Sequence, residues 1–282
     1  SICVTSTVPT VRPTSTKSIT SATTIPPGGF IQWQVETANA AGSVSLVNPV
    51  GMDLLPSQVE YVPGSFSRRT DSTFNSSGVA DPTSSLEILP NYGGTGRTLL
   101  RWTYSGSFAA GTRSTVRFQT RVKSGMLNGL GIVNRSYVWA NPTLQSGAVI
   151  AYGTPTTDES DLNGDGSPTD TIGQSAQQTA FVGPSAAVES LKLVKGTLDT
   201  EFSRFPDFGF TTPGGAVNYR LKVSNIGSIS VTNIVLLDIL PSVNDIGVID
   251  PQPRNSAWTP QLTAAIDVLG NGSAVPGTVV EY

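Results

Sequence analysis

One long stretch of sequence occurs twice in this chain. The first copy starts at Ile25 and reads IPPGGFIQWQVETANAAGSVSLVNPVGMDLLP; the second starts at Thr212 and reads TPGGAVNYRLKVSNIGSISVTNIVLLDILP. The shared features are a Pro-Gly-Gly turn (27–29 and 213–215), an aromatic residue (Trp33 and Tyr219), an asparagine (Asn39 and Asn225) and an Asp-x-Leu-Pro motif (53–56 and 238–241). A shared spacing over this length predicts two copies of one structural unit.

Side chains in the first copy alternate with a period of two. Along FIQWQVETAN, one face carries Ile31, Trp33, Val35 and Thr37. The same period recurs in AAGTRSTVRFQTRV, where one face carries Val116, Phe118, Thr120 and Val122. The 29 glycines and 20 prolines punctuate such runs. Short strands with this punctuation predict an all-β fold of two-sheet antiparallel β-sandwiches.

The repeat divides the chain into three parts. Residues 1–25 are a Ser/Thr-rich lead-in with a candidate first strand, 26–186 the first β-sandwich with a polar insert near 153–175, and 187–282 the second β-sandwich. The second copy has no counterpart of Trp102 or of the 116–122 strand, so we expect this sandwich to be truncated in the chain. Its missing strands come either from a longer protein or from a neighbour by strand addition.

The composition argues against an enzyme. The chain has no histidine, which removes the usual general base and the imidazole metal ligand. Its one cysteine, Cys3, excludes an intrachain disulfide; it is either a reduced thiol or a partner for a cysteine elsewhere. The net charge of −3 offers no basic field to a nucleic acid, and no apolar run is long enough to form a transmembrane segment.

Three segments carry a resemblance to a known family. They are VNYRLKVSNIGSISVTNIVLLDILP in the second copy, and WTYSGSFAAGTRSTVRFQTRV and NRSYVWA in the first. They resemble a repeat of bacterial cell-surface proteins, the conserved domain of unknown function number eleven. The resemblance implies tandem immunoglobulin-like β-sandwiches on the cell exterior, as in surface-layer and adhesin-like proteins, and it implies no catalytic residue. The polar insert of the first copy departs from the family's pattern.

The insert contains an acidic motif with the spacing of a calcium loop. In TTDESDLNGDGSPTDT, oxygen-bearing side chains fall at Asp161, Asn163, Asp165, Ser167 and Asp170. Ligands two residues apart converge where the chain curls, and calcium takes six to eight oxygens. The segment is not an EF-hand, because Ile172 stands where a bidentate glutamate is needed and no helices flank it. The alternatives are a short calcium loop, with calcium as cofactor, and a solvated acidic turn.

We expect other polar residues of the repeat to have structural roles. We expect Asp53 and Asp238 to cap turns by accepting backbone N–H groups, and Asn39 and Asn225 to be turn residues.

Some surface sandwiches contain an intramolecular Lys–Asn crosslink, and the second copy has residues of both types. Its candidates are Lys192 or Lys195 with Asn218 or Asn225. Such a bond needs a buried acid beside it, and the sequence identifies none there.

The sequence therefore favours a structural function. We expect a non-enzymatic building block of an extracellular bacterial protein array, at the cell surface or in the cell envelope, of the surface-layer kind. Its expected partners are other copies of itself, in a homo-oligomer, or other surface proteins. The alternative is the stalk or ligand-binding module of an adhesin.

Overall fold

The computed structural model describes residues 8–247 and 251–281, and its regular structure is all-β, as predicted. Cys3 lies outside the described residues. The chain divides after Val231 into two compact units. The helical elements among the described residues are three 3-10 turns: η1 (Thr83–Ser85), η2 (Tyr92–Gly94) and η3 (Pro142–Leu144).

Two large sheets build the first sandwich. The five-stranded sheet has the order β2-β4-β12-β7, with β8 also paired to β12; its strands are β2 (Pro13–Ile19), β4 (Phe30–Asn39), β12 (Arg113–Val122), β7 (Val59–Tyr61) and β8 (Ser67–Arg68). The six-stranded sheet has the order β16-β17-β14-β6-β10-β9; its strands are β16 (Pro155–Thr157), β17 (Thr171–Gln174), β14 (Tyr137–Trp139), β6 (Val50–Leu54), β10 (Leu99–Thr103) and β9 (Glu87–Leu89).

Three smaller sheets complete this sandwich. A three-stranded sheet has the order β13-β18-β3, with β13 (Gly131–Asn134), β18 (Gln178–Val182) and β3 (Thr24–Ile25). The two-stranded sheets join β1 (Thr10–Val11) to β15 (Val149–Ile150) and β11 (Ser107–Phe108) to β5 (Leu46–Val47).

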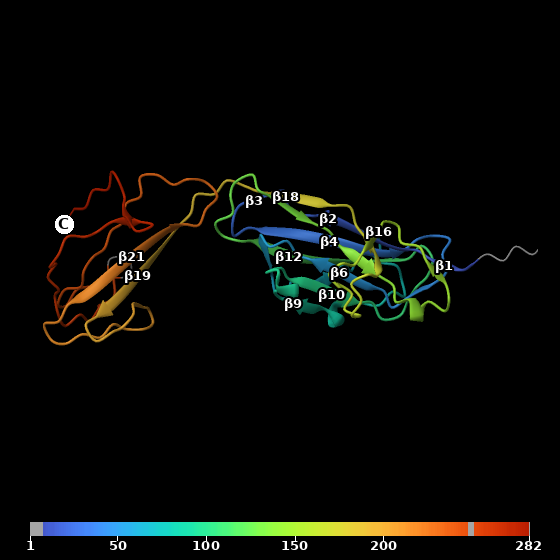
Figure 1. The fold of residues 1–282 in the computed structure, drawn as a ribbon, viewed down its shortest axis with the longest axis horizontal. Coiled ribbons are helices and arrows are strands. Elements are labelled where there is room, and N and C mark those ends of the chain that lie inside the picture. Colours follow the sequence, from blue (N-terminus) through green and yellow to red (C-terminus); the bar gives the residue numbers. More distant parts are fainter. Residues whose placement is uncertain (1–7, 248–250, 282) are drawn as a thin grey trace, which may run out of the picture. The chain divides into compact units, whose positions relative to one another are not determined.

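The main hydrophobic core draws side chains from both large sheets, which form two layers in Figure 1. From β4 it takes Ile31, Trp33 and Val35, and from β10 it takes Leu100 and Trp102, all fully buried. The predicted alternation of β4 and β12 is confirmed, because every second residue of both strands is buried. Burial of these large side chains is the main source of the sandwich's stability.

Strand β2 lies within the segment expected to be a lead-in. Its seven residues, PTSTKSI, pair antiparallel with β4 from Pro13 opposite Asn39 to Ile19 opposite Trp33. Pro13, Ser15 and Lys17 are buried, so this strand turns a proline, a hydroxyl and a lysine toward the interior. Pairing with β4 and these inward contacts hold the strand in place despite its polar sequence.

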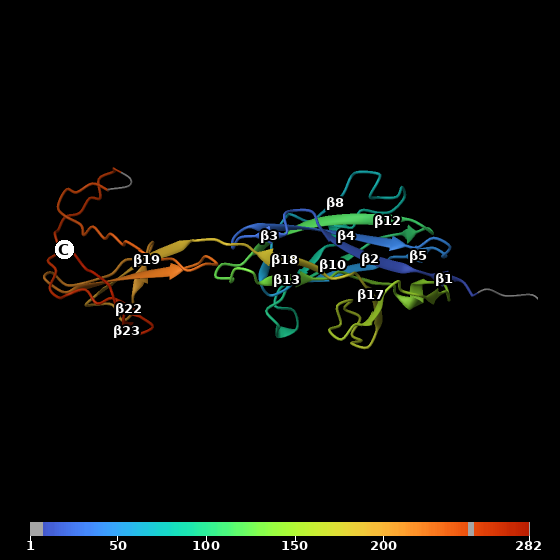
Figure 2. The same ribbon diagram turned by 90° about the horizontal axis from the view of Figure 1, so that it is seen from above.

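The polar insert covers the outer face of the six-stranded sheet. A second core cluster there contains Met52 and Leu54 of β6, Trp139 and, from the insert, Leu162. The insert's loop runs between β16, an edge strand of this sheet, and its neighbour β17, beside which it lies in Figure 2. Strand β6 is consequently buried on both faces, and all five of its residues are buried. One face of β6 meets the second cluster, and the other turns Asp53 toward the main core.

The absence of a side chain at Gly51 leaves room for an indole ring against strand β6. Gly51 pairs directly with Trp102 on β10. A Cβ added at Gly51 would lie 2.3 Å from Cε2 of Trp102 and 2.4 Å from its Nε1. Trp102 is fully buried and its ring lies 5.3 Å from that of Phe66, centroid to centroid. The glycine is therefore required by packing.

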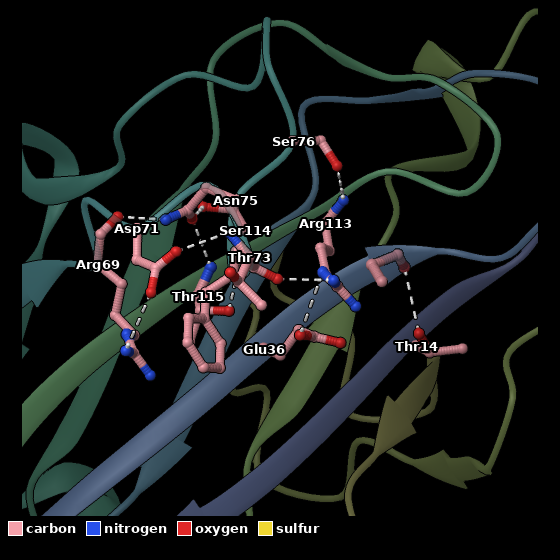
Figure 3. Close-up of polar contacts among 12 residues, drawn as sticks. Thr14, Glu36, Arg69, Asp71, Thr73, Asn75, Ser76, Arg113, Ser114 and Thr115 are labelled. Carbon is pink, nitrogen blue, oxygen red and sulfur yellow. Dashed lines mark hydrogen bonds and ion pairs between the residues drawn. The ribbon is translucent and has the colours of Figure 1, made fainter.

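A polar loop between β8 and β9 is fastened to β12 by Asn75 (Figure 3). Asn75 Oδ1 accepts hydrogen bonds from the backbone N–H of Thr115 (2.9 Å) and the hydroxyl of Ser114 (3.2 Å). The guanidinium of Arg113 donates to the carbonyl of Thr73 (2.6 Å). The loop is thus ordered by hydrogen bonds to β12.

The second copy contributes a three-stranded sheet of order β20-β19-β21. Its strands are β20 (Ser203–Arg204), β19 (Val188–Gly196) and β21 (Val217–Asn225). The second compact unit contains the hairpin of β22 (Leu269–Gly270) and β23 (Ser273–Ala274).

If the two copies of the repeat had the same structure, residues 230–241 (SVTNIVLLDILP) would contain a strand, but they contain none. The counterpart in the first copy, β6, lies between β10 and β14 and hydrogen-bonds to both. Among the described residues, the second copy has no strand equivalent to either partner. Because a strand needs a neighbouring backbone for its N–H and C=O groups, this segment stays irregular.

Candidate functional site

The sandwich interior contains a lysine. Lys17 points inward from β2, and its side chain has no solvent exposure. Its Nζ lies 4.6 Å from the centroid of the Trp33 ring and 5.0 Å from that of Phe118. An amine among aromatic rings and away from water is unusual, because lysine is almost never fully buried without a partner.

The partner of Lys17 is Asp53. Lys17 Nζ donates a hydrogen bond to Asp53 Oδ2, and the side chain of Asp53 is also fully buried. The second oxygen, Oδ1, has no hydrogen-bond partner. The expectation that Asp53 caps a turn is therefore wrong: burial of β6 on both faces turns this carboxyl into the core.

Asn134 completes the cluster from β13. It is 2 % exposed, and its Oδ1 accepts a hydrogen bond from the backbone N–H of Arg135 at 2.9 Å. Burial raises the pKa of the Asp53 carboxyl, and the neighbouring amide of Asn134 opposes this rise, although its Nδ2 makes no hydrogen bond of ordinary geometry. A buried amide N–H₂ without a partner is rare and calls for an explanation.

Two serines align the strands that carry Lys17 and Asn134. The hydroxyls of Ser15 and Ser136 are 2.8 Å apart, and both residues are buried. Ser15 lies two positions before Lys17 and Ser136 two positions after Asn134. Ser136 lies in the short link between β13 and β14, so this contact brings the end of β13, where Asn134 lies, next to β2.

The surroundings favour the uncharged forms of the pair. Burial raises the pKa of Asp53 above its usual value, although Lys17, Asn134 and Arg97 oppose the rise. Burial likewise lowers the pKa of Lys17, although Asp53 opposes the fall. Both shifts have desolvation as their largest cause, and they favour a neutral amine beside a protonated carboxyl.

The second copy repeats part of this arrangement in register. In the first copy Lys17 pairs with Val35 and Ile19 with Trp33. In the second, Lys192 pairs with Leu221, which corresponds to Val35 in the repeat. The Nζ of Lys192 lies 4.5 Å from the ring centroid of Tyr219, the counterpart of Trp33.

Lys192 is therefore the counterpart of Lys17, as Asp238 is of Asp53. The other candidates for a crosslink, Lys195 and Asn218, pair directly on β19 and β21. Sequence reasoning missed Lys17 and Asn134. The signal that could have found Lys17 is a lysine, in each copy, on the strand that pairs with the one carrying the repeat's aromatic residue.

The turn asparagines behave as expected. Asn39 Nδ2 donates to the carbonyls of Val44 (2.8 Å) and Phe108 (2.9 Å), and its Oδ1 accepts from the backbone N–H of Arg12 (3.1 Å). Asn225 Nδ2 similarly donates to the carbonyl of a nearby loop residue at 2.8 Å.

The predicted calcium ligands lie in one loop, between β16 and β17. Asn163 Nδ2 donates to Asp170 Oδ2 (3.0 Å), and Asp165 and Asp170 are close enough to perturb each other's pKa. Asp161 Oδ1 accepts from the backbone N–H of Gly166 (3.2 Å), and Asp165 Oδ1 from that of Ser167 (2.9 Å). Several of these oxygens thus bind the loop's own N–H groups, as in Asx turns.

Burial raises the pKa of Asp165. The pKa of Asp170 is lowered although burial opposes the shift, because hydrogen bonds with Asp165, Ser167 and Asn163 stabilise its carboxylate. Within residues 8–247 and 251–281, no three Asp, Glu or Cys side chains form a group that could hold a metal ion. Calcium binding, in which neutral oxygens also take part, stays a prediction.

The described part of the chain has no helix that is long and apolar enough to cross a membrane. No protein-family model and no curated protein matches the sequence.

Several solved structures are similar to the chain. The full-length major pilin SpaD from Corynebacterium diphtheriae is 11 % identical, with 68 % of this chain and 39 % of that chain covered and a TM-score of 0.35. The major pilin SpaA from the same organism is 16 % identical, with coverages of 65 % and 40 % and a TM-score of 0.38. BcpA, the major pilin subunit of Bacillus cereus, is 12 % identical, with coverages of 76 % and 55 % and a TM-score of 0.35. The chain thus spans about two fifths of the length of either Corynebacterium pilin.

Proposed function

We propose that this chain is a structural module of an extracellular bacterial protein assembly. In this proposal the tandem β-sandwiches contact other copies of themselves or other surface proteins in an array of the surface-layer kind. The chain acts at the cell surface and performs no catalysis on an external substrate. Membership of the cell-surface repeat family is part of the same proposal and rests on the shared motif residues.

The observation that carries this proposal is a contrast between the two copies. In the first copy Met52 is fully buried and Leu54 is 9 % exposed. Their counterparts in the second copy, Leu237 and Ile239, are 76 % and 43 % exposed. An apolar segment that is covered in one copy and exposed in the other is a surface that needs a partner.

The partner that fits is a β-strand. In the first copy, β10 and β14 pair with both edges of β6 and so satisfy its backbone. Addition of strands from another molecule would give residues 234–240 of the second copy neighbours of the same kind. Calcium bound in the insert loop would add rigidity, and this too is part of the proposal.

The proposal is tested by assembly of the purified chain. Light scattering after size-exclusion chromatography should show oligomers, and electron microscopy should show ordered sheets or filaments. Leu237→Asp should reduce assembly, whereas the matched change Leu198→Asp, at an exposed leucine outside this segment, should not. A chain that stays monomeric at all concentrations, and instead binds a glycan or a host protein saturably, would favour the adhesin module.

A further inference from the structure

We propose that the folded chain joins Lys17 to Asn134 by an amide bond between Nζ and Cγ, with Asp53 as the acid–base group. This modification is an activity of the chain on itself and goes beyond the proposed function. It would covalently connect β2 to β13, two strands that belong to different sheets.

The first support is that the three reacting groups lie together and are shielded from water. Lys17 and Asp53 have fully buried side chains in direct contact, and Asn134 lies beside Asp53 with 2 % exposure. The hydrogen bond between the hydroxyls of Ser15 and Ser136 holds β2 beside the chain segment that follows Asn134. Holding an amine and an amide together in one geometry removes most of the entropic barrier to their reaction.

The second support is a buried hydrogen-bond donor that has no partner. Asn134 Nδ2 is buried without a hydrogen-bond partner, and Asp53 Oδ1 is buried without one as well. An ion pair between Lys17 and Asp53 alone would account for neither atom. Both are accounted for if Nδ2 is the leaving group and Asp53 is the group that delivers its proton.

The third support is chemical. An amine is a nucleophile only when it is neutral, and desolvation lowers the pKa of Lys17 in that direction. The aromatic rings of Trp33 and Phe118 supply the apolar surroundings. The carboxyl of Asp53, whose pKa burial raises, can hold the proton that the reaction needs.

The step is balanced in atoms and electrons. The Nζ lone pair of Lys17 attacks Cγ of Asn134, and the developing charge on Oδ1 is stabilised by the backbone N–H of Arg135. Asp53 takes a proton from Nζ and gives a proton to Nδ2. The Cγ–Nδ2 bond breaks and ammonia leaves, so that the Nζ–Cγ amide replaces the primary amide without any oxidant or reductant.

Mass spectrometry of the intact chain provides the test. The folded wild-type protein should be lighter than its sequence mass by one molecule of ammonia. A tryptic digest should contain one branched peptide that joins the Lys17 segment to the Asn134 segment. A folded wild-type chain with the full sequence mass would overturn the proposal.

Variants separate the reaction from other causes of mass loss. Lys17→Met, Asp53→Asn and Asn134→Ala should each restore the full mass, while the control Lys222→Met, at an exposed lysine, should keep the deficit. Asp53→Asn retains both bonding partners, so a deficit that persists in it contradicts the role of the acid. Circular dichroism shows which variants fold, and the wild-type mass decides the question even if none does.

A further control concerns asparagine chemistry at other sites. Asn-Gly steps at Asn128, Asn163 and Asn271 can lose ammonia by closing a ring on their own backbone. Such a loss leaves linear peptides and persists in Lys17→Met. A deficit located at these steps, with no branched peptide, would also overturn the proposal.

Discussion

Replacing Gly51 by alanine should destabilise the first sandwich by about 2–3 kcal/mol, in the upper part of the range for overpacked cores. The new methyl group would lie 2.3–2.6 Å from three atoms of the Trp102 indole. The ring is rigid, fully buried and packed against Phe66, so it has no free space to enter. Either the ring or strand β6 must move, and β6 is hydrogen-bonded on both sides.

The effect can be read from urea or thermal unfolding of the full chain. Trp33, Trp102 and Trp139 lie in the first sandwich, so a Trp258→Phe background makes tryptophan fluorescence report on it alone. The expected loss of stability in Gly51→Ala corresponds to a decrease in Tm of about 4–12 °C for a domain of this size.

The matched control is Gly131→Ala on β13. A Cβ at Gly131 would meet its nearest atom, Thr179 Cγ2, at 3.6 Å, an ordinary contact. This change should be neutral or stabilise by up to about 1 kcal/mol. The packing argument is refuted if Gly51→Ala is as stable as the background, or if the two alanine variants lose the same amount.

Three further predictions concern polar groups. Asn39→Ala leaves the buried carbonyl of Phe108 and other backbone groups unpaired and should destabilise by about 2–4 kcal/mol in urea unfolding; a loss near zero contradicts the assignment. Burial raises the pKa of Tyr152 to about 12, so the native chain keeps a proton that the unfolded chain releases near pH 10. The stability from this group is present below pH 10 and lost as the pH rises toward 12, and Tyr152→Phe should flatten the fall. Calcium at a hundredfold excess over its Kd should stabilise by about 2.7 kcal/mol, reversed by chelator and weakened in Asp165→Asn; no heat of binding in calorimetry counts against the loop.

The sequence predicted those strands that pair with a strand of the same alternating pattern. Strands β4 and β12 alternate apolar and polar residues, and their pairing along nearly their whole length matches that pattern. The alternation is visible locally because one face of each strand meets the core and the other does not.

The sequence failed where burial is decided by distant segments. Lys17 lies in a Ser/Thr-rich run, and its charge indicates exposure unless the acid that neutralises it is known. That acid, Asp53, lies on the face of β6 that meets the main core, while the insert covers the opposite face. Residues 234–240 have the apolar pattern of β6 and yet form no strand, because pairing depends on partners that the local pattern does not reveal.

The parallel pairings at the two ends of the first sandwich affect its response to tension. Strand β1 runs parallel to β15, and β18 runs parallel to β3. If the chain is stretched along its length, β1 and β18 are each drawn along their own axes past a neighbour that the rest of the sandwich holds. Their inter-strand hydrogen bonds are then sheared together instead of opening one at a time. Such a geometry suits a module that has to transmit force without extending.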